Sequence, residues 1–415
     1  MIKKGDYMNS KIEKFLNDNL EKTIKYNPND DGTLIGLPYK YTVPCVSDMF
    51  QEIYYWDTYF TNVGLIELGR VELAKGNADN MMFLIDKFGF MPNGSRTYYL
   101  NRSQPPYLSF MVRDIFAVTN DKEWLKKAYV SLTKEYEFWQ TQKVLANGLN
   151  AYTNYPVDII DDATEFAKDF IARTGYEQPE IFDDDIVNKI CQSYSSVAES
   201  GWDCNSRVLA DGPDYASVDL NSLLYGLEKN MADFARVLEN GEEKIWENRS
   251  LERLNKMQSL WDEERGIFID YNTKTEKFSD YVSAGSFYPL FVGLASKEQA
   301  EKSVKNLIES LELKYGLSSG EIDPKWNCQW DYPNVWAPMQ YIAYKGLMNY
   351  GFSEDAERLA KKYISLLENG FEETGNFWEK YNGNTGEVTT NEYDAPPMMG
   401  WTAGVYIHFC KELNI

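Results

Sequence analysis

The chain has 415 residues, of which 43% are hydrophobic and 26% are charged, a composition typical of folded globular proteins and not of disordered ones. Acidic residues outnumber basic ones by 64 to 42, and the net charge of -22 disfavours nucleic acid and acidic membrane surfaces as partners. The single histidine, His408, excludes metal and catalytic sites that need several imidazoles. If the protein is an enzyme, carboxylates are therefore its candidate acids and bases.

The amino-terminal residues 1–22 contain lysines but no apolar segment before the charges resume, which predicts that they are not a signal peptide. No stretch approaches about 18 uncharged apolar residues, so we expect no membrane span. The cysteines are scattered without a CxxC pair, which predicts reduced thiols and neither a metal cluster nor a redox pair. These features together predict a cytoplasmic protein. The five cysteines are Cys45, Cys191, Cys204, Cys328 and Cys410.

Apolar residues recur at helical spacing along most of the chain. In the first such segment Ile12, Leu16 and Leu20 share one face, and Ser10 is a candidate N-cap. A short alternating segment at 266–270 is typical of a strand. The segments that predict helices are 10–26, 56–75, 105–119, 121–142, 215–240, 241–261, 297–313, 335–350, 353–368 and 401–413.

This pattern predicts about ten to twelve helices with no Pro- or Ser-rich linker between them. Because domain boundaries usually fall in such linkers, we expect one all-α domain over residues 1–415, with residues 1–43 as an N-terminal helical lead-in.

Loops rich in Gly, Pro, Trp and acidic residues separate the predicted helices, and loops on a rigid scaffold are where sites are usually built. Helix caps and turns would explain any single Gly or Pro, but the shared composition of these loops favours a site. The loops span residues 44–57, 91–106, 198–207, 320–338 and 376–401.

Acid–base chemistry without histidine needs two carboxyls in different environments, one kept protonated and one ionised. Asp203 directly follows Gly201-Trp202 in a predicted turn, and Glu379 lies between aromatic residues in a Gly- and Asn-rich loop. Aromatic neighbours raise the pKa of a carboxyl by desolvation and offer flat faces to a substrate. Asp57, after three aromatic residues, is equally well interpreted as the N-cap of a helix. A cap or an ion pair is the alternative for each carboxyl.

Three other features of the sequence have two interpretations each. Arg102 and Gln104, ahead of two prolines, form either a substrate-binding fork or a helix start. His408 lies in an apolar helical segment and is interpreted as a core or supporting residue, not as a catalyst. The acidic run at 183–185 is typical of a solvated surface and lacks the spacing of a calcium-binding loop.

Two of the loops resemble signature sequences of the trehalase family. Residues 92–106, PNGSRTYYLNRSQPP, are similar to the first signature, and residues 329–336, QWDYPNVW, to the second. The segments 199–203, 50–57 and 219–221 match the family in the same order along the chain. The resemblance implies an (α/α)6 barrel and an enzyme that hydrolyses an α-glycoside with inversion of configuration. It implies a small carbohydrate as the binding partner and no cofactor or metal.

The resemblance also implies roles for individual residues. Asp203 is the implied general acid and Glu379 the implied general base, with carboxyls about 6.5–9.5 Å apart in an inverting enzyme. Glu392 is expected to orient the leaving sugar or to close a lid. The implied substrate-binding residues are Phe50, Trp56, Asp57, Asn93, Arg102, Gln104, Gly201, Gln329, Trp330 and Glu392.

The chain departs from the family pattern on the side of the leaving group. Residues 47–50 read SDMF where trehalases carry GGRF, so an arginine is missing, and Arg173 is only a stand-in for the arginine of a second motif. The sequence therefore predicts hydrolysis of trehalose or a related small α-glucoside. The alternatives are a glucosylglycerate, mannosylglycerate or oligosaccharide hydrolase of the sister α-glucosidase family, or an inactive sugar-binding homologue.

Overall fold

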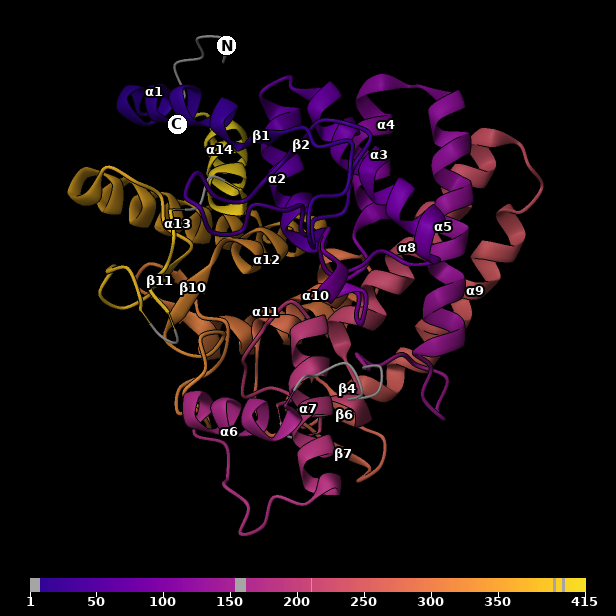
Figure 1. Cartoon of the computed structure of the whole chain (residues 1–415), viewed down its shortest axis with the longest axis vertical. Helices are drawn as coiled ribbons and strands as arrows, with labels where there is room; N and C mark the ends of the chain where they lie inside the picture. The colour runs from indigo at the N-terminus through magenta and orange to yellow at the C-terminus, as the bar shows by residue number, and fades with distance from the viewer. Residues whose placement is uncertain (1–7, 154–161, 210, 391–392, 398–399) are drawn as a thin grey trace.

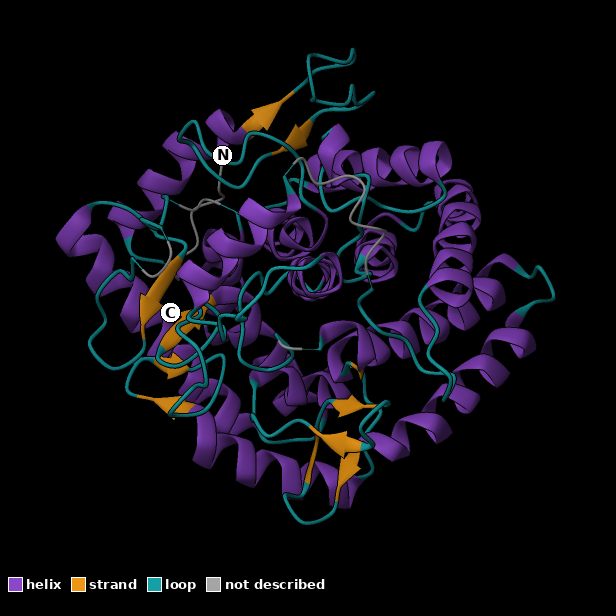
Figure 2. Cartoon of the chain, turned by 60° about the horizontal axis from the view of Figure 1, so that its bottom comes forward, coloured by secondary structure: helices purple, strands orange, loops and turns teal. Residues whose placement is uncertain are grey.

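A computed structural model of the chain describes residues 8–153, 162–209, 211–390, 393–397 and 400–415 (Figure 1). Helices dominate these residues, and the strands are short pieces at the edges of the helical assembly (Figure 2). The helices are α1 (Ser10–Leu20), α2 (Tyr55–Glu67), α3 (Val71–Phe88), α4 (Leu108–Thr119), α5 (Lys122–Gln142), α6 (Ala163–Thr174), α7 (Asp184–Glu199), α8 (Val218–Leu238), α9 (Glu243–Met257), α10 (Tyr288–Phe291), α11 (Lys297–Leu311), α12 (Ala337–Asn349), α13 (Ser353–Thr374) and α14 (Trp401–Leu413).

The strands pair antiparallel in small ladders between the helices. The longest pairing joins β10 to β11 and places Trp336 opposite Lys380. The strands are β1 (Ile24–Lys25), β2 (Tyr41–Thr42), β3 (Tyr215–Ala216), β4 (Trp261–Asp262), β5 (Ile267–Phe268), β6 (Tyr271–Asn272), β7 (Lys277–Phe278), β8 (Glu312–Leu313), β9 (Gly316–Leu317), β10 (Asn334–Trp336) and β11 (Lys380–Asn382).

Six helices form a closed inner ring, because each of them contacts the next and the last contacts the first. In order these helices are α2, α4, α8, α10, α12 and α14. Outer helices α3, α5, α9 and α13 each pack on the inner helix that precedes them in the chain. This is the (α/α)6 barrel, and it confirms the predicted fold class. The boundaries of a single domain over 1–415, with a lead-in over 1–43, stay a prediction.

Burial separates the inner helices from the outer ones. In α2, 11 of 13 residues are buried, because the helix is covered on all sides. In α13, 9 of 22 residues are buried, along one face. Two inner helices approach very closely: a Cβ added at Gly64 of α2 would lie 2.5 Å from the Cα of Gly404 in α14. Glycine at these two positions is what allows the ring to close.

The predicted single helix over residues 56–75 is wrong. The chain breaks between α2 and α3 at Gly69, whose φ of 70° is incompatible with a right-handed helix. The break turns the chain back so that α3 packs on the outside of α2. The prediction also missed α6, α7 and α10, which lie within or beside loop-like sequence. Among the described residues, no helix combines the length and the apolar character that a membrane span requires.

The prediction of five reduced cysteines is wrong, because Cys204 and Cys328 form a disulfide. They are separated by 124 residues in the chain, yet their Cα atoms lie 5.0 Å apart. No local spacing could reveal this pair, since the fold brings the two loops together. Both cysteines belong to a small apolar cluster with residues of α6 and α7. Cys45, Cys191 and Cys410 are buried thiols.

We expect thiol titration of the protein denatured without reductant to detect 3 free thiols, and after reduction by a dithiol all 5 cysteines. The Cys204→Ser/Cys328→Ser variant should lose about 2–5 kcal/mol of unfolding free energy, because the disulfide closes a long loop in the unfolded chain. Cys191→Ser, which removes a buried thiol from the same cluster, is the matched control and should still carry the disulfide. Five reactive thiols before reduction would contradict the assignment.

Candidate active site

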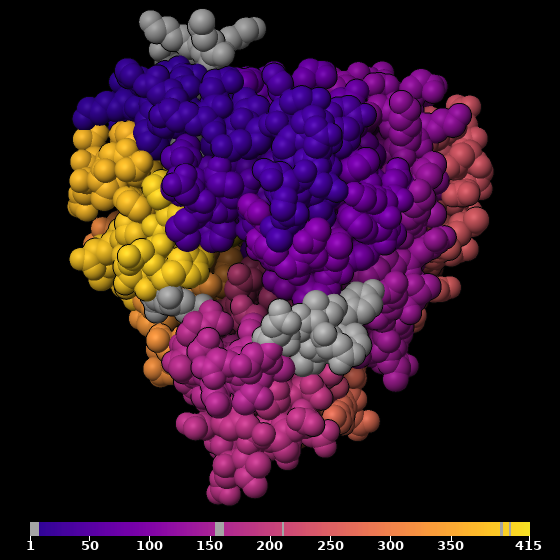
Figure 3. Space-filling model, in the orientation of Figure 1, coloured from indigo at the N-terminus to yellow at the C-terminus, as the bar shows by residue number. Residues whose placement is uncertain are grey.

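One cavity gathers the residues that the sequence singled out. Its empty volume is about 550 Å³ when the open space at its mouth is included. The surface is hollowed where the indigo N-terminal, magenta and yellow C-terminal parts of the chain meet (Figure 3). The lining residues are Phe50, Tyr54, Trp56, Asp57, Asn93, Tyr99, Arg102, Gln104, Gly201, Asp203, Gln329, Trp330, Trp336, Glu379, Tyr393 and Trp401.

Asp203, Glu379 and all the predicted binding residues except Glu392 therefore lie around the same cavity. Glu392 lies outside the described residues. The sequence did not single out Tyr54, Tyr99, Trp336, Tyr393 or Trp401, although each lies in a loop that the sequence had marked. Their position within the marked loops is the sequence feature that could have indicated them as lining residues. Arg173 is not among the lining residues: it lies on α6, with its guanidinium 5.6 Å from the ring centroid of Tyr194.

The first turn of α2 carries Trp56 and Asp57 into the cavity. The N-cap of α2 is Tyr54, so the interpretation of Asp57 as the cap is wrong. The Trp56 amide donates to the side-chain oxygen of Gln104 at 3.2 Å, and the Tyr55 amide donates to the carbonyl of Asn93 at 3.0 Å. These bonds fasten the first signature to the start of α2 and satisfy amides at the helix terminus.

Within the first signature, Arg102 and Asn93 orient each other. The Arg102 Nε donates to Asn93 Oδ1 at 2.9 Å, and the Asn93 amide donates to the Arg102 carbonyl at 3.0 Å. The Arg102 guanidinium also lies 5.2 Å from the ring centroid of Tyr99. Arg102 therefore belongs to a cavity wall and not to a helix start.

A sharp turn after α7 brings Asp203 to the cavity. Gly201 has a φ of 78°, and a Cβ at this position would lie 2.6 Å from Cε2 of Trp56. Both the left-handed backbone and the contact with the indole require glycine here. The turn thus packs the segment that carries Asp203 directly against the first turn of α2.

A buried ion pair that the sequence did not indicate supports this turn. Lys143 donates to both oxygens of Glu199, at 2.9 and 3.0 Å, and both side chains are almost completely buried. Glu199 also accepts from the amide of Ser103 at 2.9 Å. The last residue of α7 is therefore joined to the end of α5 and to the first signature, and the joint fixes where the turn begins.

The second signature packs against the Asp203 loop. Trp330 stacks on Trp336 with centroids 3.9 Å apart, and the Trp330 amide donates to the Cys204 carbonyl at 3.0 Å. Asp331, fully buried, accepts from the amide and the hydroxyl of Ser206 at 2.8 and 2.6 Å. Together with the disulfide, these bonds hold two loops from distant parts of the chain in one wall.

Glu379 is placed by the pairing of β10 with β11, since it directly precedes Lys380. Its carboxyl is buried, and Tyr393 donates to its Oε1 at 3.0 Å. Lys380 Nζ donates to Gln329 Oε1 at 2.7 Å, which links β11 to the second signature.

Three carboxyls face this cavity and affect one another. Burial raises the pKa of Asp57 well above its ordinary value, and the nearby charges of Glu379 and Asp203 raise it further. Burial, followed by the charges of Glu379 and Asp57, likewise raises the pKa of the Cys45 thiol. Among the described lining residues the single cation is Arg102. The site thus combines tryptophan walls with clustered carboxyls of unequal environment.

A helical barrel whose loops gather aromatic walls and clustered carboxyls in one cavity defines a glycoside hydrolase. The trehalase family model matches residues 1–414. The chain is 33% identical to the periplasmic trehalase of Xanthomonas axonopodis pv. citri, covering 90% of this chain and 68% of that protein. It is 32% identical to the periplasmic trehalase of Pseudomonas aeruginosa, with coverage of 91% and 72%. The chain belongs to the trehalase family.

Solved structures agree with this assignment. The neutral trehalase Nth1 of Saccharomyces cerevisiae matches with a TM-score of 0.79 and 29% identity, covering 94% of this chain and 76% of that one. The GH63 mannosylglycerate hydrolase of Thermus thermophilus shares the fold, with a TM-score of 0.66 at 15% identity and coverage of 95% and 99%. The first likeness agrees with the predicted family, and the second shows that the fold is shared with a GH63 hydrolase.

The prediction of a cytoplasmic protein is wrong. The curated relatives named above are periplasmic trehalases, which points away from the cytoplasm. The prediction rests on two kinds of observation: residues 1–22 and the rest of the given sequence contain no apolar segment typical of a signal peptide or a membrane span, and the cysteines are scattered. The Cys204–Cys328 disulfide removes the second, because disulfides persist in oxidising compartments.

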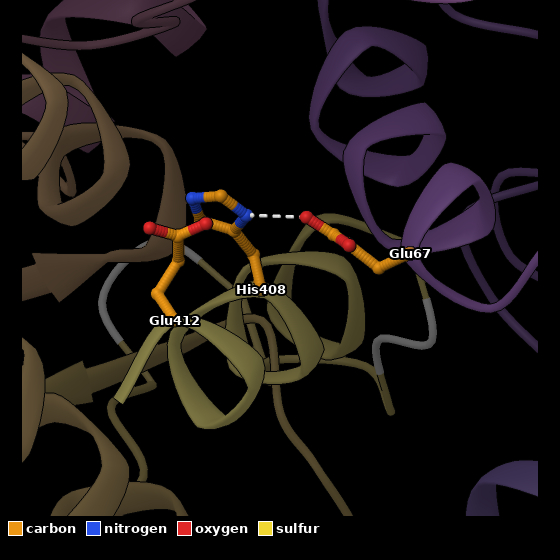
Figure 4. Close-up of side chains that lie close together, drawn as sticks. All are labelled: Glu67, His408 and Glu412. Atoms are coloured by element: carbon orange, nitrogen blue, oxygen red, sulfur yellow. Dashed lines mark hydrogen bonds and ion pairs between the residues drawn. The ribbon is translucent and has the colours of Figure 1, made fainter. Parts of the chain in front are cut away.

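Outside the cavity, Glu67, His408 and Glu412 bring carboxylate and imidazole atoms within 4.8 Å of one another (Figure 4). Both oxygens of Glu67 have protein partners: Nδ1 of His408 lies 3.1 Å from Oε1, and Lys411 donates to Oε2. His408 is buried, with its ring 5.1 Å from that of Tyr341. Glu67, His408 and Lys411 form an ion-pair network between α2 and α14, and His408 is buried in the core as the sequence predicted.

This network predicts a pH dependence of stability. Burial raises the pKa of Glu67, but bonds from His408 and Lys411 outweigh it and lower the pKa to about 2 from the ordinary 4.5. Ionised Glu67 therefore stabilises the fold fully above pH 4.5, and this stabilisation is lost as the pH falls towards 2. Glu67→Gln should lower Tm at pH 6 and much less at pH 3, as measured by thermal unfolding. Glu373→Gln, at an exposed site, is the control, and an equal Tm loss at both pH values would contradict the account.

Proposed function

We propose that the protein is an inverting α-glucosidase that hydrolyses trehalose or a related small neutral α-glucoside, with Asp203 as general acid and Glu379 as general base. The observation that carries this proposal is the meeting of both carboxyls with both signature motifs around one cavity. Inverting glycosidases need two such carboxyls, on opposite faces of the sugar, with a water molecule between the base and the anomeric carbon.

In the proposed reaction Asp203 gives its proton to the glycosidic oxygen as the bond from that oxygen to the anomeric carbon breaks. Glu379 takes a proton from the water that attacks the same carbon from the opposite face. The glucose that is attacked therefore leaves in the β configuration, and the other product leaves with its own configuration unchanged. Trehalose would yield one β-glucose and one α-glucose.

The other lining residues are proposed to bind and orient the sugar. The indoles of Trp330 and Trp56 line the cavity and give apolar atoms for its apolar surface, and Asp57, Asn93 and Gln329 offer polar groups for its hydroxyls. The raised pKa of Asp57 favours its protonated form, which can donate to a hydroxyl as well as accept from one.

The charge of the cavity favours a neutral leaving group. Three carboxyls, those of Asp57, Asp203 and Glu379, line it against the guanidinium of Arg102 among the described lining residues. Since Asp203 as general acid and Asp57 with its raised pKa are protonated, the charge of Arg102 is balanced by ionised Glu379. An acidic leaving group such as glycerate would therefore find no surplus cation among the described lining residues. This charge balance supports trehalose over mannosylglycerate or glucosylglycerate as the substrate.

The test is a panel of trehalose, maltose, kojibiose, glucosylglycerate and mannosylglycerate, with proton NMR of the first-formed anomers. We expect turnover of trehalose, with β-glucose and α-glucose in equal initial amounts, and little or no turnover of the two glycerate compounds. Cleavage of a glycerate compound without cleavage of trehalose would assign the protein to the alternative activity. Binding of sugars without any turnover would identify an inactive homologue, and two α-anomers would contradict inversion.

A further inference from the structure

The proposed base, Glu379, has a phenol as a hydrogen-bond partner. Tyr393 comes from the segment that precedes α14, 14 residues further along the chain, and donates to Glu379 Oε1 at 3.0 Å. The same segment is fastened to the start of β11, because the Glu379 amide donates to the carbonyl of Pro396 at 3.2 Å, and Trp378 forms a β-bridge with Pro397. The phenol is therefore held beside the carboxylate by the backbone.

A buried ammonium faces the ring of this tyrosine. Nζ of Lys380 lies 3.9 Å from the ring centroid of Tyr393 and 5.4 Å from that of Trp336. It also donates to Gln329 Oε1 at 2.7 Å, and the Lys380 side chain is completely buried. A cation over the face of a phenol withdraws electron density from the ring, which makes the hydroxyl a stronger hydrogen-bond donor.

The need for such a donor follows from the charges around Glu379. Asp57 of α2 and Asp203 of the turn after α7 line the same cavity, and Cys45 lies close enough for its pKa to respond to Glu379. Neighbouring carboxylates favour protonation of one another, whereas a general base must be ionised. A hydrogen bond donated to the ionised form, and a nearby ammonium, act in the opposite direction.

We propose that Tyr393 and Lys380 act together as positioning residues for Glu379: the phenol, polarised by the ammonium, holds the carboxylate ionised and oriented for deprotonation of the attacking water. This inference rests on the proposed function and deepens it. Neither residue touches the reacting atoms in this account, since both act through Glu379. The consequence is a base that stays active at lower pH than two neighbouring carboxyls would otherwise allow.

The test is the pH profile of kcat on trehalose for Tyr393→Phe, which removes one hydroxyl and keeps the ring. The acidic limb should move to higher pH by about one unit, so that the loss of rate is about tenfold greater at acidic pH than on the plateau. Lys380→Met should move the limb in the same direction, and Lys380→Arg, which keeps the cation, should restore most of the profile. Tyr350→Phe is the matched control: it removes a hydroxyl that donates to the carbonyl of Ala295, away from the cavity, and should leave the profile unchanged.

A uniform loss of rate across the pH range in Tyr393→Phe, or no change at all, would overturn the inference. Thermal unfolding of each variant shows whether it is folded, and Tyr393→Phe decides the matter if Lys380→Met does not fold. The failure of the proposed function has a different signature: Glu379→Gln would keep its turnover, whatever the profile of Tyr393→Phe.

Discussion

Asp203→Asn and Glu379→Gln are each expected to lower kcat on trehalose by about 10²–10⁴-fold, the range that a positioned acid or base contributes. Asparagine in place of Asp203 would occupy the same volume, but its amide has no acidic proton to give to a leaving oxygen. Glutamine in place of Glu379 cannot accept a proton from water. The loss should appear in kcat and not in KM, because both groups act on the transition state and contribute little to ground-state binding.

Steady-state kinetics on purified variants, checked for folding by thermal unfolding, measures this effect. Glu387→Gln is a matched control, since Glu387 is an exposed residue of the same loop as Glu379 and does not line the cavity. The double variant should lose little more than the worse single variant, because the two groups act in one step. Unchanged kcat in either single variant would remove that residue from the mechanism.

The second large effect is expected from Arg207→Met, which should cost about 3–5 kcal/mol of unfolding free energy. Arg207 is buried and donates to both oxygens of Asp219, at 3.0 and 2.6 Å, and to both oxygens of Asp270. Its guanidinium also lies 5.0 Å from the ring centroid of Trp202. Methionine would leave two buried carboxylates without their cation, which is why the expected cost is far above that of a surface pair.

Denaturant unfolding of the variants Arg207→Met and Arg236→Met compares their losses of unfolding free energy. Arg236 pairs with three carboxylates, one more than Arg207, but it is half-exposed, so its loss should change the unfolding free energy by less than about 1 kcal/mol. Adding Asp219→Asn and Asp270→Asn to Arg207→Met should recover part of the loss, because the uncompensated charges are removed. Equal effects of the two arginine variants would show that burial does not decide the cost.

Much of the site could be predicted from the sequence because its residues lie in signatures of fixed local spacing. Asn93, Arg102 and Gln104 share one such signature, and Gln329 and Trp330 share the other. Asp203 and Glu379 could be chosen among 64 acidic residues because each sits in a Gly- or aromatic-rich loop that resembles the family. All of these residues line one cavity in the structure.

The supporting contacts could not be predicted, because they join residues without any shared local pattern. The pair of Lys143 and Glu199 links the end of α5 to the end of α7. Lys143 looks like an ordinary surface charge in sequence, and the segment that contains Glu199 gives no sign of its partner. Tyr393 is one of 30 tyrosines, and nothing next to it indicates a contact with Glu379. Only the folded barrel brings these residues close enough to be partners.

The sequence by itself determined two properties: it excluded sites built from several imidazoles, and it set the helical fold class. One histidine among 415 residues is enough for the first, and the helical period with its long loops predicts the second, because such a period is a property of short stretches of chain. The disulfide between Cys204 and Cys328, the break at Gly69 and the clustering of Asp57 with Glu379 and Asp203 were decided by the tertiary structure. The physical reason is that the closure of the helix ring sets which distant loops meet. The interactions of charges and thiols depend on their separation in space and not on their separation along the chain.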